Sequence, residues 1–171
     1  MTLIRRLRVI QCLCLVLAAL FLSSAVVEAQ DEAAVLLHRI GTTNCDDYRG
    51  SLDLLLIDLN KAPGTRGVVF VYEGDHELGV YDGRGNRIGA KLHKSEVGVA
   101  KRIIGYYEDH LRFRSFPMDR ITFVEAGFQR TFATEFWLVP SGANAPKASP
   151  TLKKLKQKKR RPDSEVFCAH P

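Results

Sequence analysis

The sequence predicts a two-layer α/β sandwich, in which a mixed sheet carries helices on one face in the order β-α-β-α-β-β. Two amphipathic helical patterns alternate with runs of β-branched and aromatic residues. Strands joined through helices favour right-handed crossovers and a parallel core, whereas a short final connection favours an antiparallel pair. Together these patterns predict a sheet that is parallel at its centre and antiparallel at its end.

The first half of the domain is predicted to be a strand, a helix and a second strand. The first strand covers the apolar run over residues 33–40. Asn44 or Asp46 can cap the helix, and Pro63 ends it. Its apolar face repeats at helical spacing: Leu52, Leu55, Leu56 and Leu59. The unbroken β-branched and aromatic run over 67–72 is typical of a central strand buried on both faces.

The second half is predicted to be a loop, a helix and two strands. Residues 73–94 are polar and glycine-rich, with hairpin turn chemistry over 80–88. The cap and apolar face of the second helix are expected at Ser95, Val97, Ala100, Ile103, Ile104, Tyr107 and Leu111. Strands are predicted over 120–125 and 134–139, with a turn around Gly127. Four aromatic residues on the strands are expected in the core: Phe70, Phe123, Phe136 and Trp137.

Residues 1–29 are predicted to be a secretory signal peptide. Three arginines precede the apolar run over residues 9–22, and Val27-x-Ala29 fits the cleavage rule. The run is shorter than the roughly 20 residues of a spanning helix, although an uncleaved anchor is the alternative. The mature chain, residues 30–171, is therefore expected to be periplasmic or secreted, without a membrane span after cleavage.

Cys45 and Cys168 are the two cysteines of the predicted mature chain. In an oxidising compartment an even pair suggests a disulfide, which here would join the start of the domain to the end of the chain. Two unpaired thiols and pairing between chains are the alternatives.

The positive charge of the chain is concentrated in its C-terminal part. Residues 30–146 contain 14 Lys/Arg and 16 Asp/Glu, whereas residues 147–171 contain 8 and 2. The composition over 141–171 predicts a Pro/Ala linker and a disordered Lys/Arg-rich tail. The cationic run consists of Lys153, Lys154, Lys156, Lys158, Lys159, Arg160 and Arg161. It could hold an anionic polymer by salt-sensitive attraction, without sequence-specific nucleic-acid recognition; a solvated tail without a ligand is the alternative.

The polar stretch after the central strand offers weak candidates for chemistry. Its possible ligands for a divalent metal are Asp75, His76, Glu77 and His93, whose spacing matches no compact metal signature. Ser95 could act with His93 and Asp75 in hydrolysis, but the sequence has no Gly-x-Ser-x-Gly elbow. The Gly83-Arg84-Gly85 segment lacks the third glycine of a dinucleotide loop. No catalytic residue, metal or cofactor is therefore predicted.

Three segments carry a family resemblance. Tyr72-Glu73-Gly74-Asp75-His76-Glu77 follows a strand, residues 100–107 lie in a helix, and residues 117–121 precede the next strand. Over residues 33–139 this layout is similar to the OmpA-like peptidoglycan-binding domain. The resemblance implies an α/β sandwich and a peptidoglycan ligand, with Glu77 in the place of the family's ligand-binding aspartate.

The chain departs from that family at its arginine. Val99 stands at the corresponding position, and Arg102 lies one helical turn further on. The resemblance therefore implies ligand-binding roles for Glu77, Arg102 and Asp75. The chain also resembles exported bacterial proteins with a leucine-rich helix, a Gly-x-Val-x-Val-Tyr strand and a terminal Glu-x-Trp-x-Val-Pro strand.

These patterns predict an exported, non-catalytic cell-envelope binding protein. Its expected partner is the cell wall, bound through peptidoglycan or another anionic envelope polymer. An exported hydrolase that uses residues 73–94 and a protein-interaction module at the envelope are the alternatives.

Overall fold

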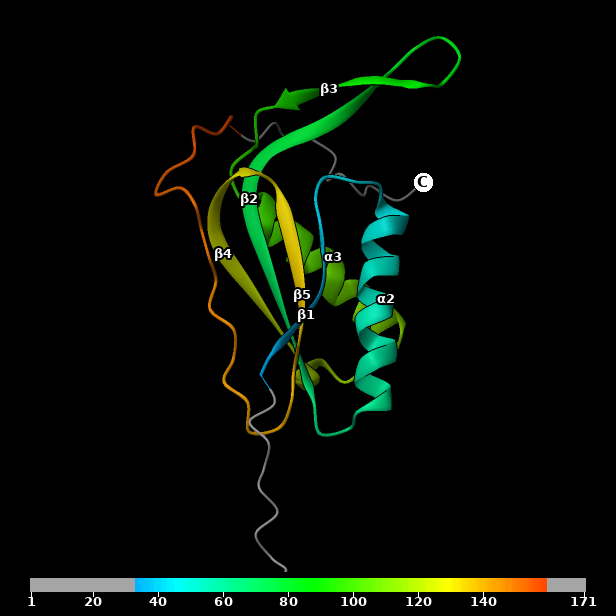
Figure 1. Ribbon diagram of the computed structural model, residues 1–171, viewed down its shortest axis with the longest axis vertical. Coiled ribbons are helices and arrows are strands. Elements are labelled where there is room, and N and C mark those ends of the chain that lie inside the picture. Colours follow the sequence, from blue (N-terminus) through cyan, green and yellow to red (C-terminus); the bar gives the residue numbers. More distant parts are fainter. Residues whose placement is uncertain (1–32, 160–171) are drawn as a thin grey trace, which may run out of the picture. The chain divides into compact units, whose positions relative to one another are not determined.

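The computed structural model describes residues 33–159, which form five strands and two α-helices (Figure 1). The elements are β1 (Val35–Ile40), α2 (Cys45–Lys61), β2 (Arg66–Tyr81), β3 (Arg87–His93), α3 (Val99–Phe113), the short 3-10 helix η2 (Met118–Arg120), β4 (Ile121–Thr131) and β5 (Ala133–Val139). The predicted signal peptide, Arg160, Arg161 and Cys168 lie outside the described residues.

The fold class predicted from the sequence is wrong. The sheet order is β1-β5-β2-β3, with β4 on β2, and the β1–β5, β5–β2 and β2–β3 pairs are all antiparallel. Among the pairs of described strands, β2–β4 alone is parallel. The mostly antiparallel sheet curls into a half-barrel (Figure 1), so the molecule is not the predicted two-layer α/β sandwich with a parallel core. The element order is β-α-β-β-α-β-β.

The short connection between β4 and β5 explains much of this error. A single residue, Phe132, joins the two strands, yet they do not form a hairpin, because they pair with opposite edges of β2. The connection crosses β2 at Gly74, where a Cβ atom would lie 2.1 Å from the Thr131 carbonyl carbon. The Phe132 N–H donates to the Asp75 carbonyl at 3.0 Å. Glycine is therefore required where one backbone passes so closely over another.

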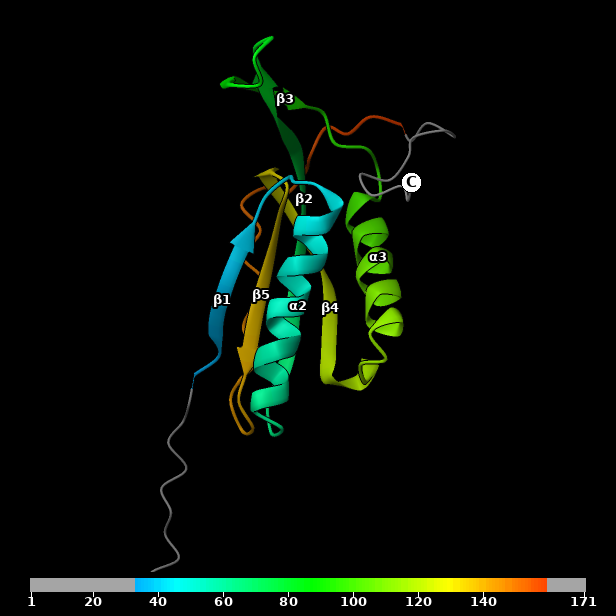
Figure 2. The same cartoon turned by 90° about the vertical axis from the view of Figure 1, so that its right-hand side faces the viewer.

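The two helices bury the larger part of the core. Helices α2 and α3 both lie against the sheet (Figure 2). Residues of β2 such as Val69 and Val71 pack in one cluster with the buried faces of the two helices. The predicted face of α2 is confirmed, since its four leucines are buried, and Asn44 caps the helix by accepting from the Asp47 N–H. The second helix starts later than predicted. Gly98 is its N-cap and Val97 is 56% exposed, so Ser95 is not its cap.

The opposite side of β2 packs beneath the C-terminal part of the chain. Its apolar cluster includes Val68, Phe70 and Tyr72, with Ala143 and Ala148 packed against it. We call residues 143–159 the strap. The strap runs beside β4 in Figure 1, where it is orange. Its described residues lie on the domain, where Ala143 and Ala148 pack on the sheet and Ser149 is hydrogen-bonded to Tyr72 and Gln129.

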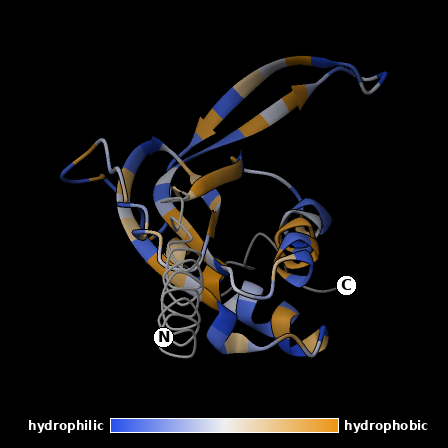
Figure 3. Ribbon diagram, turned by 60° about the horizontal axis from the view of Figure 1, so that its bottom comes forward, coloured by the Kyte–Doolittle hydropathy of each residue, from blue (hydrophilic) through white to orange (hydrophobic). Residues whose placement is uncertain are grey.

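Residues 76–93 form a hairpin, which we call the arm, instead of the expected loop. The strand β2 continues to Tyr81, and β3 pairs with it from His76↔His93 to Tyr81↔Arg87. The hairpin turn expected over 80–88 is present: the Asp82 N–H donates to the Asn86 carbonyl at 2.9 Å. The arm projects beyond the sheet and carries both hydrophobic and hydrophilic residues (Figure 3).

Candidate functional site

The described lysines of the cationic run predicted from the sequence form an exposed surface on the strap. Lys153, Lys154, Lys156, Lys158 and Lys159 are all exposed, whereas Leu155 and Gln157 are half-buried. From residue 154 to 158 the chain thus alternates outward lysines with inward residues. In an extended chain, alternate side chains lie about 6.6 Å apart on one side. None of these five ammonium groups pairs with a carboxylate in the described part of the chain.

Backbone hydrogen bonds hold the lysine run at both ends. At one end, the N–H groups of Thr151 and Leu152 donate to the Phe128 carbonyl, each at 3.0 Å. At the other end, the Lys158 N–H donates to the Ser95 carbonyl at 2.8 Å, and its carbonyl accepts from Val97. Lys153, Lys154 and Lys156 therefore lie between two fixed points on the domain, and Lys158 is one of those points.

Proline and glycine fit the strap to the sheet. Gly127, where a turn was expected, lies inside β4 with a φ of +87° and interrupts the register with β2. A side chain at Gly127 would meet Pro150 at 3.1 Å. Strand β4 therefore bulges at Gly127, which leaves room for Pro150 of the strap.

A buried polar cluster lies where the strap meets the start of α3. Glu73 accepts from the Ala100 N–H at 3.3 Å and from the Gln157 amide, which also donates to the Glu96 carbonyl. Asp75 is bonded to Lys94 at 2.6 Å and to the Ser95 N–H at 3.3 Å.

The electrostatics of this cluster favour a charged Asp75 and a neutral His76. Burial raises the pKa of Asp75, but the bonds from Lys94 and Ser95 lower it, and its net pKa is below the usual value. Burial is also the main reason that the pKa of His76 falls to about 4, although Asp75 opposes the shift. The imidazole of His76 lies 3.3 Å from the Thr42 hydroxyl and stacks on Phe132.

The three ligand-binding residues implied by the family resemblance have separate partners. Glu77 lies on the exposed arm and pairs with Arg87 at 3.2 Å. Arg102 lies on α3, where it pairs with Glu96 at 3.6 Å and donates to the Val97 carbonyl at 2.9 Å. Asp75 is buried in the cluster above. The structure therefore does not bring Glu77 and Arg102 to one shared partner.

The weaker chemical candidates are engaged in other contacts. Ser95 is fully buried, and its hydroxyl donates to the Glu96 carbonyl at 3.3 Å. Between residues 33 and 159, no three His, Cys, Asp or Glu side chains gather in a way that could hold a metal ion. No helix in this range is long and apolar enough to span a membrane.

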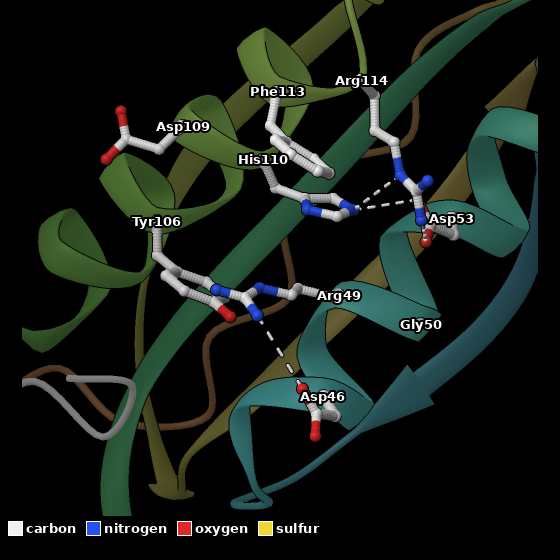
Figure 4. A pocket seen from close by; sticks show the side chains of 9 residues that line it. All are labelled: Asp46, Arg49, Gly50, Asp53, Tyr106, Asp109, His110, Phe113 and Arg114. Carbon is white, nitrogen blue, oxygen red and sulfur yellow. Dashed lines mark hydrogen bonds and ion pairs between the residues drawn. The ribbon is translucent and has the colours of Figure 1, made fainter. Parts of the chain in front are cut away.

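A groove between α2 and α3 was missed in the sequence (Figure 4). Its volume is about 590 Å³, and we call it the α2–α3 groove. Nine residues line it: Asp46, Arg49, Gly50 and Asp53 from α2, and Tyr106, Asp109, His110, Phe113 and Arg114 from α3 and its end. The Arg49 guanidinium lies over the Tyr106 ring at 5.2 Å, and Arg114 lies over Phe113 at 5.8 Å.

Three charged or titratable groups join the helices at one side of the α2–α3 groove. Asp53 Oδ1 lies 2.9 Å from His110 Nε2 and accepts from Arg114 Nε at 3.0 Å, and Arg114 also binds its second oxygen (Figure 4). Partial burial raises the pKa of Asp53, but the bonds from Arg114 and His110 lower it below its usual value. The carboxylate is therefore charged at neutral pH and links the two helices.

The spacing of four groove residues was a weak sequence signal for the α2–α3 groove. Arg49 and Asp53 are four residues apart, as are Tyr106 and His110, so each pair shares a helix face. Such spacing is also typical of an ordinary solvent-facing surface. Only the packing of α2 beside α3 turns the two faces into a groove.

The comparisons with known proteins add no relative. No protein-family model, curated protein or solved structure matches this chain significantly.

Proposed function

We propose that this chain is an exported, non-catalytic envelope protein that binds an anionic envelope polymer through the lysines of the strap. The observation that carries the proposal is the row of exposed lysines between the two anchors, at Leu152 and Lys158. A cationic run already ordered on a domain loses less conformational freedom on binding than a free tail does. Ammonium groups without carboxylate partners in the described chain are also available to phosphates or carboxylates of a polymer.

Contrast with three other basic side chains supports this choice. Arg87 on the arm, Lys94 directly after it and Arg102 on α3 each pair with an acid. The strap contributes six lysines and no acid over residues 147–159. Its field therefore attracts polyanions, and salt should screen that attraction within about 10 Å at 0.1 M.

Sedimentation with purified cell-wall sacculi tests the proposal, using the mature full-length chain. The triple substitution Lys154→Gln, Lys156→Gln, Lys158→Gln should weaken binding on the order of a hundredfold at low salt, at about 1 kcal/mol per lysine near an anionic surface. Lys61→Gln, Lys91→Gln, Lys101→Gln is the matched control, because these three lysines are exposed elsewhere. Sacculi stripped of attached phosphate polymers distinguish those polymers from the peptidoglycan itself.

Two results would count against the proposal. The first is that the wild-type chain stays in the supernatant at low salt. The second is that the variant with three substituted strap lysines binds as well as the control variant. In the second case another surface of the protein holds the polymer.

A second candidate function, a protein-interaction module at the envelope, is favoured by the arm. Large apolar side chains are exposed on both of its strands: Val80, Tyr81, Ile88 and Leu92, with Ile88 65% exposed. Exposed apolar groups on a projecting element are typical of contact surfaces between proteins. A photo-crosslinker at position 88 in living cells should then capture one defined partner, and random labelling of many proteins would contradict this function.

A further inference from the structure

We propose that the outer edge of β1 pairs with the same edge of a second copy, so that two chains form a symmetric dimer with one continuous sheet. The inference goes beyond the proposed function and is independent of polymer binding by the strap. It rests on the edge that β1 leaves open, on the sides of the sheet that its residues occupy, and on the apolar residues of α2 beside it.

The strand β1 lies at the end of the sheet. Within the described residues it pairs with β5 alone, so the backbone groups that point away from β5 have no neighbouring strand to bind. Such an edge is a template for a further strand. The outer side of β4, by contrast, is bridged by the strap between Phe128 and Leu152, and β3 in the arm carries Arg87 and Lys91.

The edge strand β1 is mainly apolar. Val35 and Leu36 are 53% and 41% exposed. Arg39 is its one basic residue with a permanent charge, and Glu135 pairs with it at 3.7 Å. Burial lowers the pKa of His38 below its ordinary value, so the imidazole is neutral at pH 7. Charged side chains often protect sheet edges from pairing, and β1 carries no unpaired charge of this kind.

A bulge in β1 decides which residues lie on each side of the sheet. Opposed side chains of an antiparallel pair lie on the same side. Leu36 opposes Trp137, and Arg39 opposes Glu135, which binds the Trp137 indole, so both lie on the strap side. The bulge between Leu36 and His38 places two consecutive residues on the helix side. By their partners in β5 or their contacts with the helix-side cluster, the residues on that side are Val35, Leu37, His38 and Ile40.

This arrangement makes β1 complementary to itself. In one two-fold register, helix-side residues oppose helix-side residues and strap-side residues oppose strap-side residues: Val35 with the partner's Ile40, Leu36 with the partner's Arg39, and Leu37 with the partner's His38. A shift by one residue would oppose Leu36 to the partner's His38 or the partner's Ile40, which lie on the other side of the sheet. Each pair occurs twice in a two-fold interface. The bulge and the residue order of β1 therefore favour a second copy as the added strand.

Helix α2 extends the apolar surface beside β1. It begins four residues after β1 ends and runs back beside the strand (Figure 2). Leu54 and Ile57, which are 56% and 49% exposed, are three residues apart and share a helix face. Leu54 and Ile40 line a hollow of about 660 Å³ between α2 and the end of β1. Two-fold pairing places both copies of α2 on one side of the joined sheet, where burial of these side chains stabilises the dimer.

Sedimentation equilibrium of the mature full-length chain tests the dimer. Dithiothreitol is present, so that no disulfide between chains can hold two copies together. A reversible monomer–dimer equilibrium is expected without any added polymer, which separates this test from that of the proposed function. A chain that stays monomeric at the highest soluble concentration overturns the proposal.

Two substitutions at one exposed position test the register. Leu36→Glu places a carboxylate opposite the partner's Arg39, whereas Leu36→Lys places a like charge there. Because each pair occurs twice, the dissociation constant of the lysine variant should exceed that of the glutamate variant on the order of tenfold. Circular dichroism checks that both variants fold.

Ile88→Lys is the matched control on the arm, where Ile88 is 65% exposed. It should leave the dissociation constant of the dimer unchanged. Equal dissociation constants for the two Leu36 variants, or loss of the dimer in Ile88→Lys, overturn the proposal, because another surface then holds the two copies together.

Discussion

The two sides of the central strand β2 are both buried, but they are covered by different kinds of structure. On one side, Val69 and Val71 pack under two helices in a cluster of aliphatic and aromatic residues. On the other, Phe70 and Tyr72 lie under the strap, which has no regular secondary structure of its own. Regular helices cover one side, and an irregular strap covers the other.

Polar contacts contribute more to the packing on the strap side of β2. The Tyr72 hydroxyl donates to Glu135 at 3.2 Å and accepts from the Ser149 N–H at 3.0 Å. The Trp137 indole donates to the same carboxylate at 3.3 Å, and the Gln129 amide donates to the Ser149 carbonyl at 3.2 Å. A strap without internal hydrogen bonds must satisfy its backbone on the sheet, so its position depends on a few defined side chains.

Truncating one core phenylalanine on each side of β2 should give the largest loss of stability among the tests of this difference. Phe136 is fully buried, stacks on His38 at 4.4 Å and meets Tyr107 edge-on at 5.7 Å. Phe136→Ala should reduce the free energy of unfolding by about 3–5 kcal/mol, because the helices cannot collapse into the cavity. Phe70→Ala on the strap side should cost less, since an irregular segment can relax. Urea denaturation measures both, and an equal or larger loss for Phe70→Ala would contradict the comparison.

Acid should weaken the helix-covered side through His76. Its pKa is held at about 4 in the folded protein, mainly by burial, and is near 6.5 in an unfolded chain. Between pH 6.5 and 4 the unfolded chain therefore takes up a proton that the folded protein does not. The free energy of unfolding should fall by about 3 kcal/mol over this window.

Substitution isolates the contribution of His76 to this pH dependence. His76→Phe can keep the stacking on Phe132 but cannot titrate, so its stability should change less between pH 6.5 and 4.5. Parallel curves for wild type and His76→Phe would show that His76 does not titrate as proposed.

Removing one hydroxyl should loosen the strap with the smallest loss of stability. Tyr72→Phe leaves the Ser149 N–H without its partner at a cost of about 1–3 kcal/mol. Hydrogen exchange at Ser149 should become faster, while exchange in α2 and α3 should change little. Tyr81→Phe, on the exposed arm, is the control. Equal acceleration in the helices would mean that the strap and the helix-covered side unfold as one unit.

Local sequence patterns predicted the parts of the fold that depend on neighbours along the chain. The leucine repeat placed α2 and its buried face, and the apolar run over 67–72 indicated the buried half of β2. The second half of β2 was missed, because Glu73–Tyr81 is too polar to resemble a strand. It remains a strand because Glu73 and Asp75 pair with β4 and residues 76–81 pair with β3 in the arm, and pairing satisfies the backbone.

The candidate functional residues were likewise predictable from the sequence only in part. Composition alone indicated the lysine run as a cationic segment, but not that hydrogen bonds to Phe128 and Ser95 hold it on the domain. The α2–α3 groove had no recognisable motif, since its side chains come from two helices about 60 residues apart in sequence (Arg114 and Asp53 are 61 apart).

The sequence by itself determined the helices, the buried strand, the hairpin turn and the charge of the C-terminal part. Only the tertiary structure decided that β4 and β5 flank β2, that Gly74 lies under their connection, and that the strap covers one side of the sheet. The physical reason is the separation in sequence over which the deciding interactions act. Helical and strand patterns reflect interactions over a few residues, whereas strand order and strap position depend on contacts between distant residues, for which the local pattern carries no signal.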